Sequence, residues 1–170
     1  METEFVNKVA NSGLITINLE HYYPEGERIL LDIKDQLFMG MVLKEKDFRQ
    51  FIKEHDWQQY KNKFVAVSCS VDAIIPTWAY MLIASKLSGV AKKVVFGNLQ
   101  TLETVLWEEI LRDFPIEDYR DEKIVVKGCG DLPIGADAYL TLTSKLVSVA
   151  SSVMFGEPCS TVPVFKAKKV

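Results

Sequence analysis

Short apolar runs alternate with longer amphipathic segments over most of the chain. Four runs are typical of strands: KFVAVSC (63–69), KKVVFGN (92–98), KIVVKGC (123–129) and SSVMFGE (151–157). The segments between them have the apolar spacing of helices, at about 72–87, 99–114 and 136–149, and VPVFKA (162–167) is a short fifth strand. This alternation favours a parallel sheet with crossover helices.

The first 60 residues follow a different pattern. Three apolar runs, LITINL (14–19), RILLDI (28–33) and QLFMGMVL (36–43), are separated by turn-like residues and predict a small antiparallel β meander. A helix is expected over 44–60, with Phe48, Phe51 and Ile52 on its apolar face. His55 lies among charged residues of this segment and is expected to be exposed.

An internal repeat links two of the strand and helix segments. SKLSGVAKKVVFG (85–97) aligns without a gap to SKLVSVASSVMFG (144–156), and the same offset matches Ala79-Tyr80 to Ala138-Tyr139. Duplication explains the match, and so does the common preference of strands for valine and of helices for leucine. The sequence predicts a single α/β domain over residues 1–170: a meander and helix at 1–60, then a mainly parallel sheet of two βαβ units at 61–170.

Composition and charge narrow the classes of function. The net charge of −3 opposes nonspecific nucleic-acid binding, which needs a basic field. The N-terminus lacks the pattern of a secretory signal, and the longest apolar stretch is interrupted by Pro76, so we expect a cytoplasmic protein without a membrane partner. Large apolar groups at 74–82 and 104–107 indicate core packing or a dimer surface, and a homo-oligomer is expected.

Each of the three cysteines stands where a strand-like run ends. Cys69 and Cys129 occupy nearly equivalent places in the repeat, and Cys159 follows the last of its strands closely. Consecutive parallel strands point the same way, so all three thiols are expected at one carboxyl edge. Such an arrangement predicts a metal site that holds zinc or an iron-sulfur cluster. The candidates for a further ligand are Glu157, Asp72 and His21.

Other interpretations of the cysteines stay open. No CxxC pair is present, and free cysteine is often simply a core residue. Cys69, before a helix, or Cys159, in a polar turn, could instead be the nucleophile of an enzyme or a sulfur carrier. A third alternative is a noncatalytic dimeric interaction module. The phosphate-binding glycine motifs are absent, so no nucleotide cofactor is expected.

Four motifs carry a resemblance to a known family: LKEKDFR (43–49), CSVDAIIPTWAY (69–80), KGC (127–129) and FGEPCSTVP (155–163). They resemble the bacterial domain-of-unknown-function family numbered 2480, and the resemblance covers nearly the whole chain. The family has no established activity, so the resemblance implies none. Its members tend to be encoded near genes for iron-sulfur cluster assembly, which implies iron-sulfur assembly proteins as partners.

Overall fold

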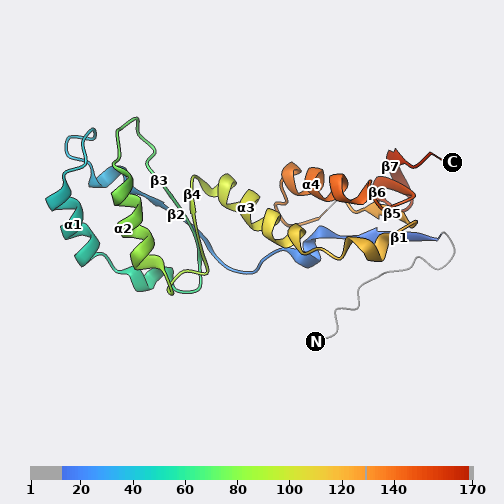
Figure 1. Ribbon diagram of the computed structural model, residues 1–170, viewed down its shortest axis with the longest axis horizontal. Coiled ribbons are helices and arrows are strands. Elements are labelled where there is room, and N and C mark those ends of the chain that lie inside the picture. The colour runs from blue at the N-terminus through green and yellow to red at the C-terminus, as the bar shows by residue number, and fades with distance from the viewer. Residues whose placement is uncertain (1–12, 129, 169–170) are drawn as a thin grey trace. The chain divides into compact units, whose positions relative to one another are not determined.

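The computed structural model describes residues 13–128 and 130–168 (Figure 1). The chain divides into two compact units. Unit 1 comprises the described parts of residues 1–24 and 106–170, and unit 2 comprises residues 25–105. Each unit has its own mainly parallel sheet and its own hydrophobic core. The mixed α/β class and the mainly parallel pairing predicted from the sequence are confirmed.

Unit 2 is continuous in sequence. Its described elements are β2 (Arg28–Asp32), the 3-10 helix η2 (Ile33–Gln36), α1 (Glu45–Glu54), the 3-10 helix η3 (Trp57–Tyr60), β3 (Phe64–Ser68), α2 (Thr77–Leu87) and β4 (Lys93–Phe96). The three strands pair in parallel in the order β2-β3-β4. Helices α1 and α2 lie side by side (Figure 1). Their buried side chains, such as Phe48 and Ile83, join Val65 and Val67 of β3 in the core of this unit.

Unit 1 is assembled from two separate stretches of chain. The first gives β1 (Leu14–Ile17) and the 3-10 helix η1 (Leu19–Tyr22). The second gives part of α3 (Leu99–Arg112), then the 3-10 helix η4 (Ile116–Tyr119), β5 (Lys123–Val126), α4 (Ala136–Leu146), β6 (Ser152–Glu157) and β7 (Ser160–Lys166). The described strands are ordered β1-β5-β6-β7, and β7 is antiparallel to β6 while the other pairs are parallel.

The two units match one another in register and in burial. Val67 pairs with Phe96 in unit 2 and Val126 pairs with Phe155 in unit 1, and the two pairs are related by the offset of the sequence repeat. The buried positions of the two crossover helices are related by the same offset. They are Ala79, Ile83 and Leu87 in α2, and Ala138, Leu142 and Leu146 in α4. The repeat seen in the sequence is therefore also a repeat of structure.

The correspondence extends to elements before the sequence repeat. The first described strand of each unit leads into a 3-10 helix, β1 into η1 and β2 into η2. Phe48 and Ile52 of α1 match Trp107 and Leu111 of α3, and all four side chains are buried in the core of their own unit. Since unit 2 lies in the sequence between η1 and the part of α3 that belongs to unit 1, one copy of the repeat is inserted into the other.

The predicted single sheet and the predicted meander are both wrong. The strands form two separate sheets within the described residues, and β1 and β2 each pair in parallel with a later strand, β5 and β3 respectively. Residues 36–43 form no third strand. They form the end of η2 and a short hairpin with one bridge between Phe38 and Val42. The apolar pattern identifies strands but does not specify their partners.

The boundaries of two helices differ from those predicted. Helix α2 begins at Thr77 rather than near Asp72, because Pro76 is its N-cap residue and favours extended backbone before it. The helix expected over 44–60 ends at Glu54, and Trp57–Tyr60 forms a separate 3-10 helix capped by Asp56. That residues 1–170 form one domain stays a prediction, but the inner boundary predicted after residue 60 falls inside unit 2.

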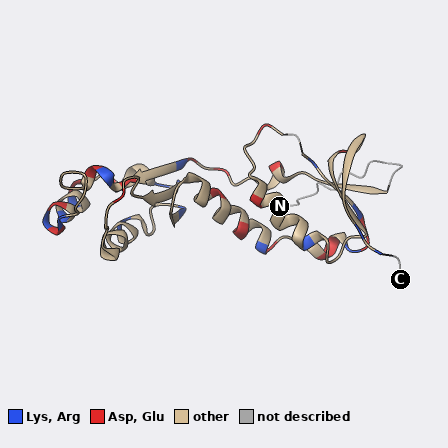
Figure 2. Cartoon of the chain, turned by 90° about the horizontal axis from the view of Figure 1, so that it is seen from above, with Lys and Arg blue, Asp and Glu red and all other residues tan. Residues whose placement is uncertain are grey.

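None of the helices in the described ranges is long and apolar enough to span a membrane. Basic and acidic positions are interspersed along the helices (Figure 2).

Candidate functional site

The predicted metal ligands are distributed over both units. Cys69 follows β3 in unit 2, whereas Cys159 lies in the turn between β6 and β7 of unit 1. The third thiol, Cys129, lies outside the described residues. Among the described strands, β3 and β5 belong to different sheets, so Cys69 and Cys159 do not follow strands of one sheet as predicted, and a site that includes all three thiols stays a prediction.

Cys69 is a half-buried thiol at the edge of the unit 2 core. Its Sγ donates a hydrogen bond to the carbonyl oxygen of Val71, at 3.6 Å. Tyr80 of α2 lies near this thiol: burial raises the pKa of Tyr80, and Cys69 adds to the rise. Asp72 is exposed in the loop between Cys69 and α2. The surroundings of Cys69 are thus those of a packed side chain with a local backbone partner.

The predicted ligands in unit 1 stand on different elements. Cys159 is exposed in the β6–β7 turn, and Glu157 is half-buried at the end of β6, where it pairs with Ser160. His21 is exposed in η1, with its Nε2 atom 3.5 Å from Nδ2 of Asn18. Within residues 13–128 and 130–168, no three His, Cys, Asp or Glu side chains come together as metal ligands would. Metal binding that involves Cys129 stays a prediction.

Two carboxylates at the carboxyl ends of the sheets organise the adjacent loops. Asp32, at the end of β2, accepts hydrogen bonds from the backbone N–H groups of Lys34 and Ser70, each at 3.1 Å. Partial burial would raise the pKa of Asp32, but these bonds and the charge of Lys34 together lower it. The carboxylate therefore fixes the start of the loop that carries Cys69.

Glu20 has the corresponding role in unit 1. It accepts a hydrogen bond from the backbone N–H of Leu132 at 2.9 Å, and this bond is the main cause of its lowered pKa. Gly130 lies so close to the Glu20 carboxylate that a side chain at this position would collide with it. Sequence reasoning missed both carboxylates. An acidic residue at the end of a strand, for Asp32, or shortly after one, for Glu20, was the available signal, but the loop partner of each is distant in sequence.

A cluster of exposed apolar side chains lies beside the loop of Cys69. A hairpin and this loop are joined by a bridge between Val42 and Ile74. We call this surface the apolar tip, and it consists of Phe38, Met39, Met41, Val42, Val71 and Ile74, all exposed. The apolar pattern of QLFMGMVL predicts a strand, which the structure does not contain. The glycine between two methionines was the signal that this run turns.

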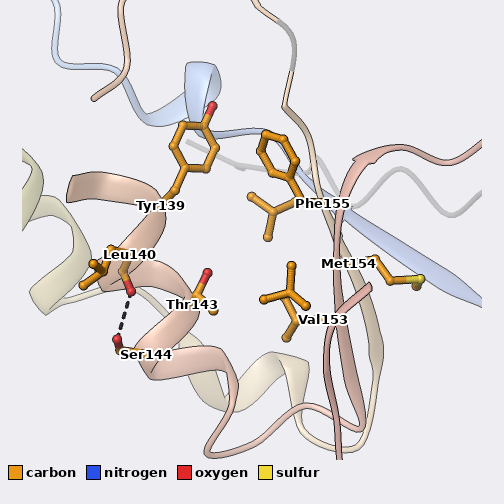
Figure 3. Close-up of a pocket in the computed structure, with 9 residues that line it drawn as sticks. Tyr139, Leu140, Thr143, Ser144, Val153, Met154 and Phe155 are labelled. Carbon is orange, nitrogen blue, oxygen red and sulfur yellow. Dashed lines mark hydrogen bonds between the residues drawn. The ribbon is translucent and has the colours of Figure 1, made fainter. Parts of the chain in front are cut away.

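Each unit also has an apolar groove between its crossover helix and its third strand. The unit 1 groove, of about 330 Å³, lies between α4 and β6, and Tyr139 and Phe155 form one end of it (Figure 3). The unit 2 groove, of about 310 Å³, lies between α2 and β4. Six positions correspond between the two: Val67, Tyr80, Met81, Ala84, Val94 and Phe96 in unit 2 match Val126, Tyr139, Leu140, Thr143, Val153 and Phe155 in unit 1.

The aromatic pair at the end of each groove has the same geometry in both units. The rings of Tyr80 and Phe96 meet edge to face with centroids 5.0 Å apart, and those of Tyr139 and Phe155 do so at 5.6 Å. Aromatic pairs of this kind stabilise the fold by more than the burial of their apolar surface alone. The grooves are therefore shaped features of the repeat, and they suit apolar groups rather than charged ones.

His55 lies in an aromatic cluster, although the sequence predicted an exposed side chain. Its ring is half-buried against Phe51, Trp57 and Tyr60, and its Nε2 atom is hydrogen-bonded to the Tyr60 hydroxyl at 2.8 Å. Burial lowers the pKa of His55, and the charge of Asp56 opposes this only in part. The neutral imidazole is thus the form that the folded protein favours.

The lowered pKa of His55 predicts a dependence of stability on pH. Because the unfolded chain binds this proton more readily than the folded one, His55 adds its full stabilisation above its ordinary pKa, near 6.5, and the free energy of unfolding falls as the pH drops below that value. The measurement is urea denaturation from pH 7.5 to 5.5, with His21 retained in all proteins. We expect the free energy of unfolding of His55→Gln to depend less on pH over this range than that of the wild-type chain. An unchanged dependence would contradict its assignment to His55.

The comparisons with known proteins bear on the family of the chain. A search of curated proteins and a search of solved structures each found no significant match. The family model described as "Protein of unknown function (DUF2480)" matches residues 3–167, which is nearly the whole chain. The resemblance seen in the sequence motifs is thereby confirmed, and the chain belongs to the DUF2480 family.

Proposed function

We propose that the protein is a noncatalytic interaction module that forms a homodimer through the apolar tip of unit 2. The observation that carries this proposal is the exposure of six neighbouring apolar side chains, among which Ile74 is 91% exposed and Met39 is 74% exposed. Single exposed apolar residues are common on soluble proteins, but a contiguous group of this kind marks an interaction surface.

The backbone holds the tip in a defined conformation. The N–H of Phe38 donates to the Val42 carbonyl at 2.7 Å, and the N–H of Val42 donates back to the Phe38 carbonyl at 3.2 Å. Between these two residues, Met39 and Gly40 have φ of 51° and 69°, in the left-handed region. That region disfavours a long side chain such as methionine, and residues held there against their preference concentrate at functional positions. The tip is therefore preorganised for contact.

The charges around the tip favour a second copy of the chain as the partner. A two-fold interface brings a surface against itself, so flanking charges of one sign would repel one another. The tip is flanked by exposed Lys34 and Asp35 on one side and by Lys44 and Glu45 on the other. Both signs are present, which permits self-complementary pairing. An anionic membrane surface would instead favour a basic excess.

The test is sedimentation velocity over a range of protein concentrations. We expect the wild-type chain to dimerise and Ile74→Lys to raise the dimer dissociation constant at least tenfold, because it places a charge in the apolar centre of the interface. Ile74 is almost fully exposed, so this substitution leaves the fold intact.

The matched control is Leu140→Lys, which changes an exposed apolar residue of unit 1 outside the tip. It should leave the dissociation constant within a factor of two. A wild-type chain that stays monomeric at the highest attainable concentration, or equal losses in both variants, would refute the proposal.

A further inference from the structure

The equivalent third strands of the two units differ in their pairing. In unit 1, β6 pairs with β5 on one side and with β7 on the other. In unit 2, the equivalent strand β4 pairs with β3, and among the described residues no strand covers its outer side. An edge strand of this kind presents backbone N–H and C=O groups for pairing with another chain.

The groove beside β4 lacks the wall that β7 supplies in unit 1. Val164 of β7 lines the unit 1 groove, at the place where the ladder between β6 and β7 shifts its register. All the residues that line the unit 2 groove come from β3, α2 and β4. Phe96 of β4 is 69% exposed, whereas its counterpart Phe155, beside β7, is 40% exposed.

We infer that β4 accepts an antiparallel strand from a partner protein, in the position that β7 occupies in unit 1. The added strand extends the sheet by backbone hydrogen bonds and places an apolar side chain in the groove, as Val164 does in unit 1. Met81 and Phe96 at the groove would be covered by it. This inference is independent of the proposed dimer, because the apolar tip and β4 share no residue.

The charges at the start of β4 define the chemistry of the partner strand. In unit 1, Ser152 pairs with Lys166 near the end of β7. The counterparts of Ser151 and Ser152 in unit 2 are Lys92 and Lys93. A strand that ended in lysine would be repelled here, whereas an acidic residue would be attracted. The partner is thus an extended segment with apolar residues followed by Asp or Glu, and not β7 of a second copy.

The experiment uses the full chain labelled with ¹⁵N, in the Ile74→Lys background so that dimerisation through the tip does not interfere. The probe is a synthetic peptide with the sequence of residues 160–166 carrying the change K166E, STVPVFE. We expect saturable changes in the amide signals of β4 and of the groove residues of α2. The unaltered peptide, STVPVFK, should bind at least fivefold more weakly.

Two matched variants locate the site. Met81→Lys, at a groove residue that is 66% exposed, should weaken peptide binding at least tenfold. Leu140→Lys changes the equivalent residue of unit 1, where β7 already covers the strand, and should leave binding within twofold. Absence of saturable changes, changes located outside β4 and α2, or equal weakening by both variants would overturn the inference. Concentration-dependent protection of β4 without peptide would also overturn it, since a second copy would then cover the edge.

Discussion

Replacing Trp107 by alanine lowers the free energy of unfolding of unit 1 by about 3–5 kcal/mol, the usual cost of removing a large buried aromatic side chain. Trp107 is 1% exposed and packs in the core of unit 1 with Leu111 and Leu142. The cost has two parts: the lost transfer of the indole from water, and the cavity that its neighbours cannot close.

The matched variant is Phe48→Ala, which removes the equivalent side chain from the core of unit 2. We expect a similar loss of about 3–5 kcal/mol, but located in unit 2. Hydrogen exchange measured for the amides of β5 and β3 separates the two effects, because each strand reports on its own core. Equal loss of protection in both strands from either variant would show that the two cores unfold together, contrary to this expectation.

Replacing Gly156 by alanine is expected to destabilise unit 1 strongly. A strained backbone conformation alone costs about 1–3 kcal/mol, and we expect a larger loss in the free energy of unfolding here. Gly156 has a φ of 124°, which L side chains rarely adopt, and a Cβ atom here would lie 2.6 Å from the carbonyl oxygen of Ser160. Since that oxygen belongs to the backbone of β7, relief requires the β6–β7 hairpin to open.

Gly89 offers a control for a positive φ without a collision. Its φ is 76°, also positive, but a Cβ atom there would meet no atom within 4 Å. The loss of stability in Gly89→Ala is therefore only the cost of the backbone conformation, about 1–2 kcal/mol. Urea denaturation of both variants gives the comparison. If Gly156→Ala were no more destabilising than Gly89→Ala, the collision with Ser160 would be unimportant.

The elements of the fold could be predicted from local pattern, but the pairing of its strands could not. Runs such as FVAVS and KIVV are strands at the expected places, because β-branched residues and short apolar stretches are local signals. The same signals mark LITI and RILLD as strands and say nothing about their partners. The meander was predicted because strands that are neighbours in sequence usually pair. The insertion of one unit into the other separates β1 from its partner β5 in the sequence, so this rule does not hold for β1.

The candidate site was predicted in part. Cys69 does follow a strand end, as its position after FVAVS indicated. The expectation that it meets Cys159 at one edge assumed one sheet, and two sheets exist within the described residues. The apolar tip was not predicted, because its exposure depends on a turn at Met39 and Gly40, and the run around Gly40 was interpreted as a strand. The role of Asp32 depends on Ser70, a contact between distant residues that periodicity does not reveal.

The insertion of unit 2 into unit 1 imposes an order on folding during synthesis. Arg28 of β2 needs only Phe64 for its partner, whereas Leu14 of β1 must wait for Lys123. At a ribosomal rate of about 5–20 residues per second, all of unit 2 is made before β5 exists. Among the described strands, β1 is therefore made first but cannot pair with β5 until all of unit 2 has been made, so unit 2 can complete its core while β1 still lacks a partner. During this delay the unpaired backbone of β1 is open to pairing with other chains, which is a route to aggregation.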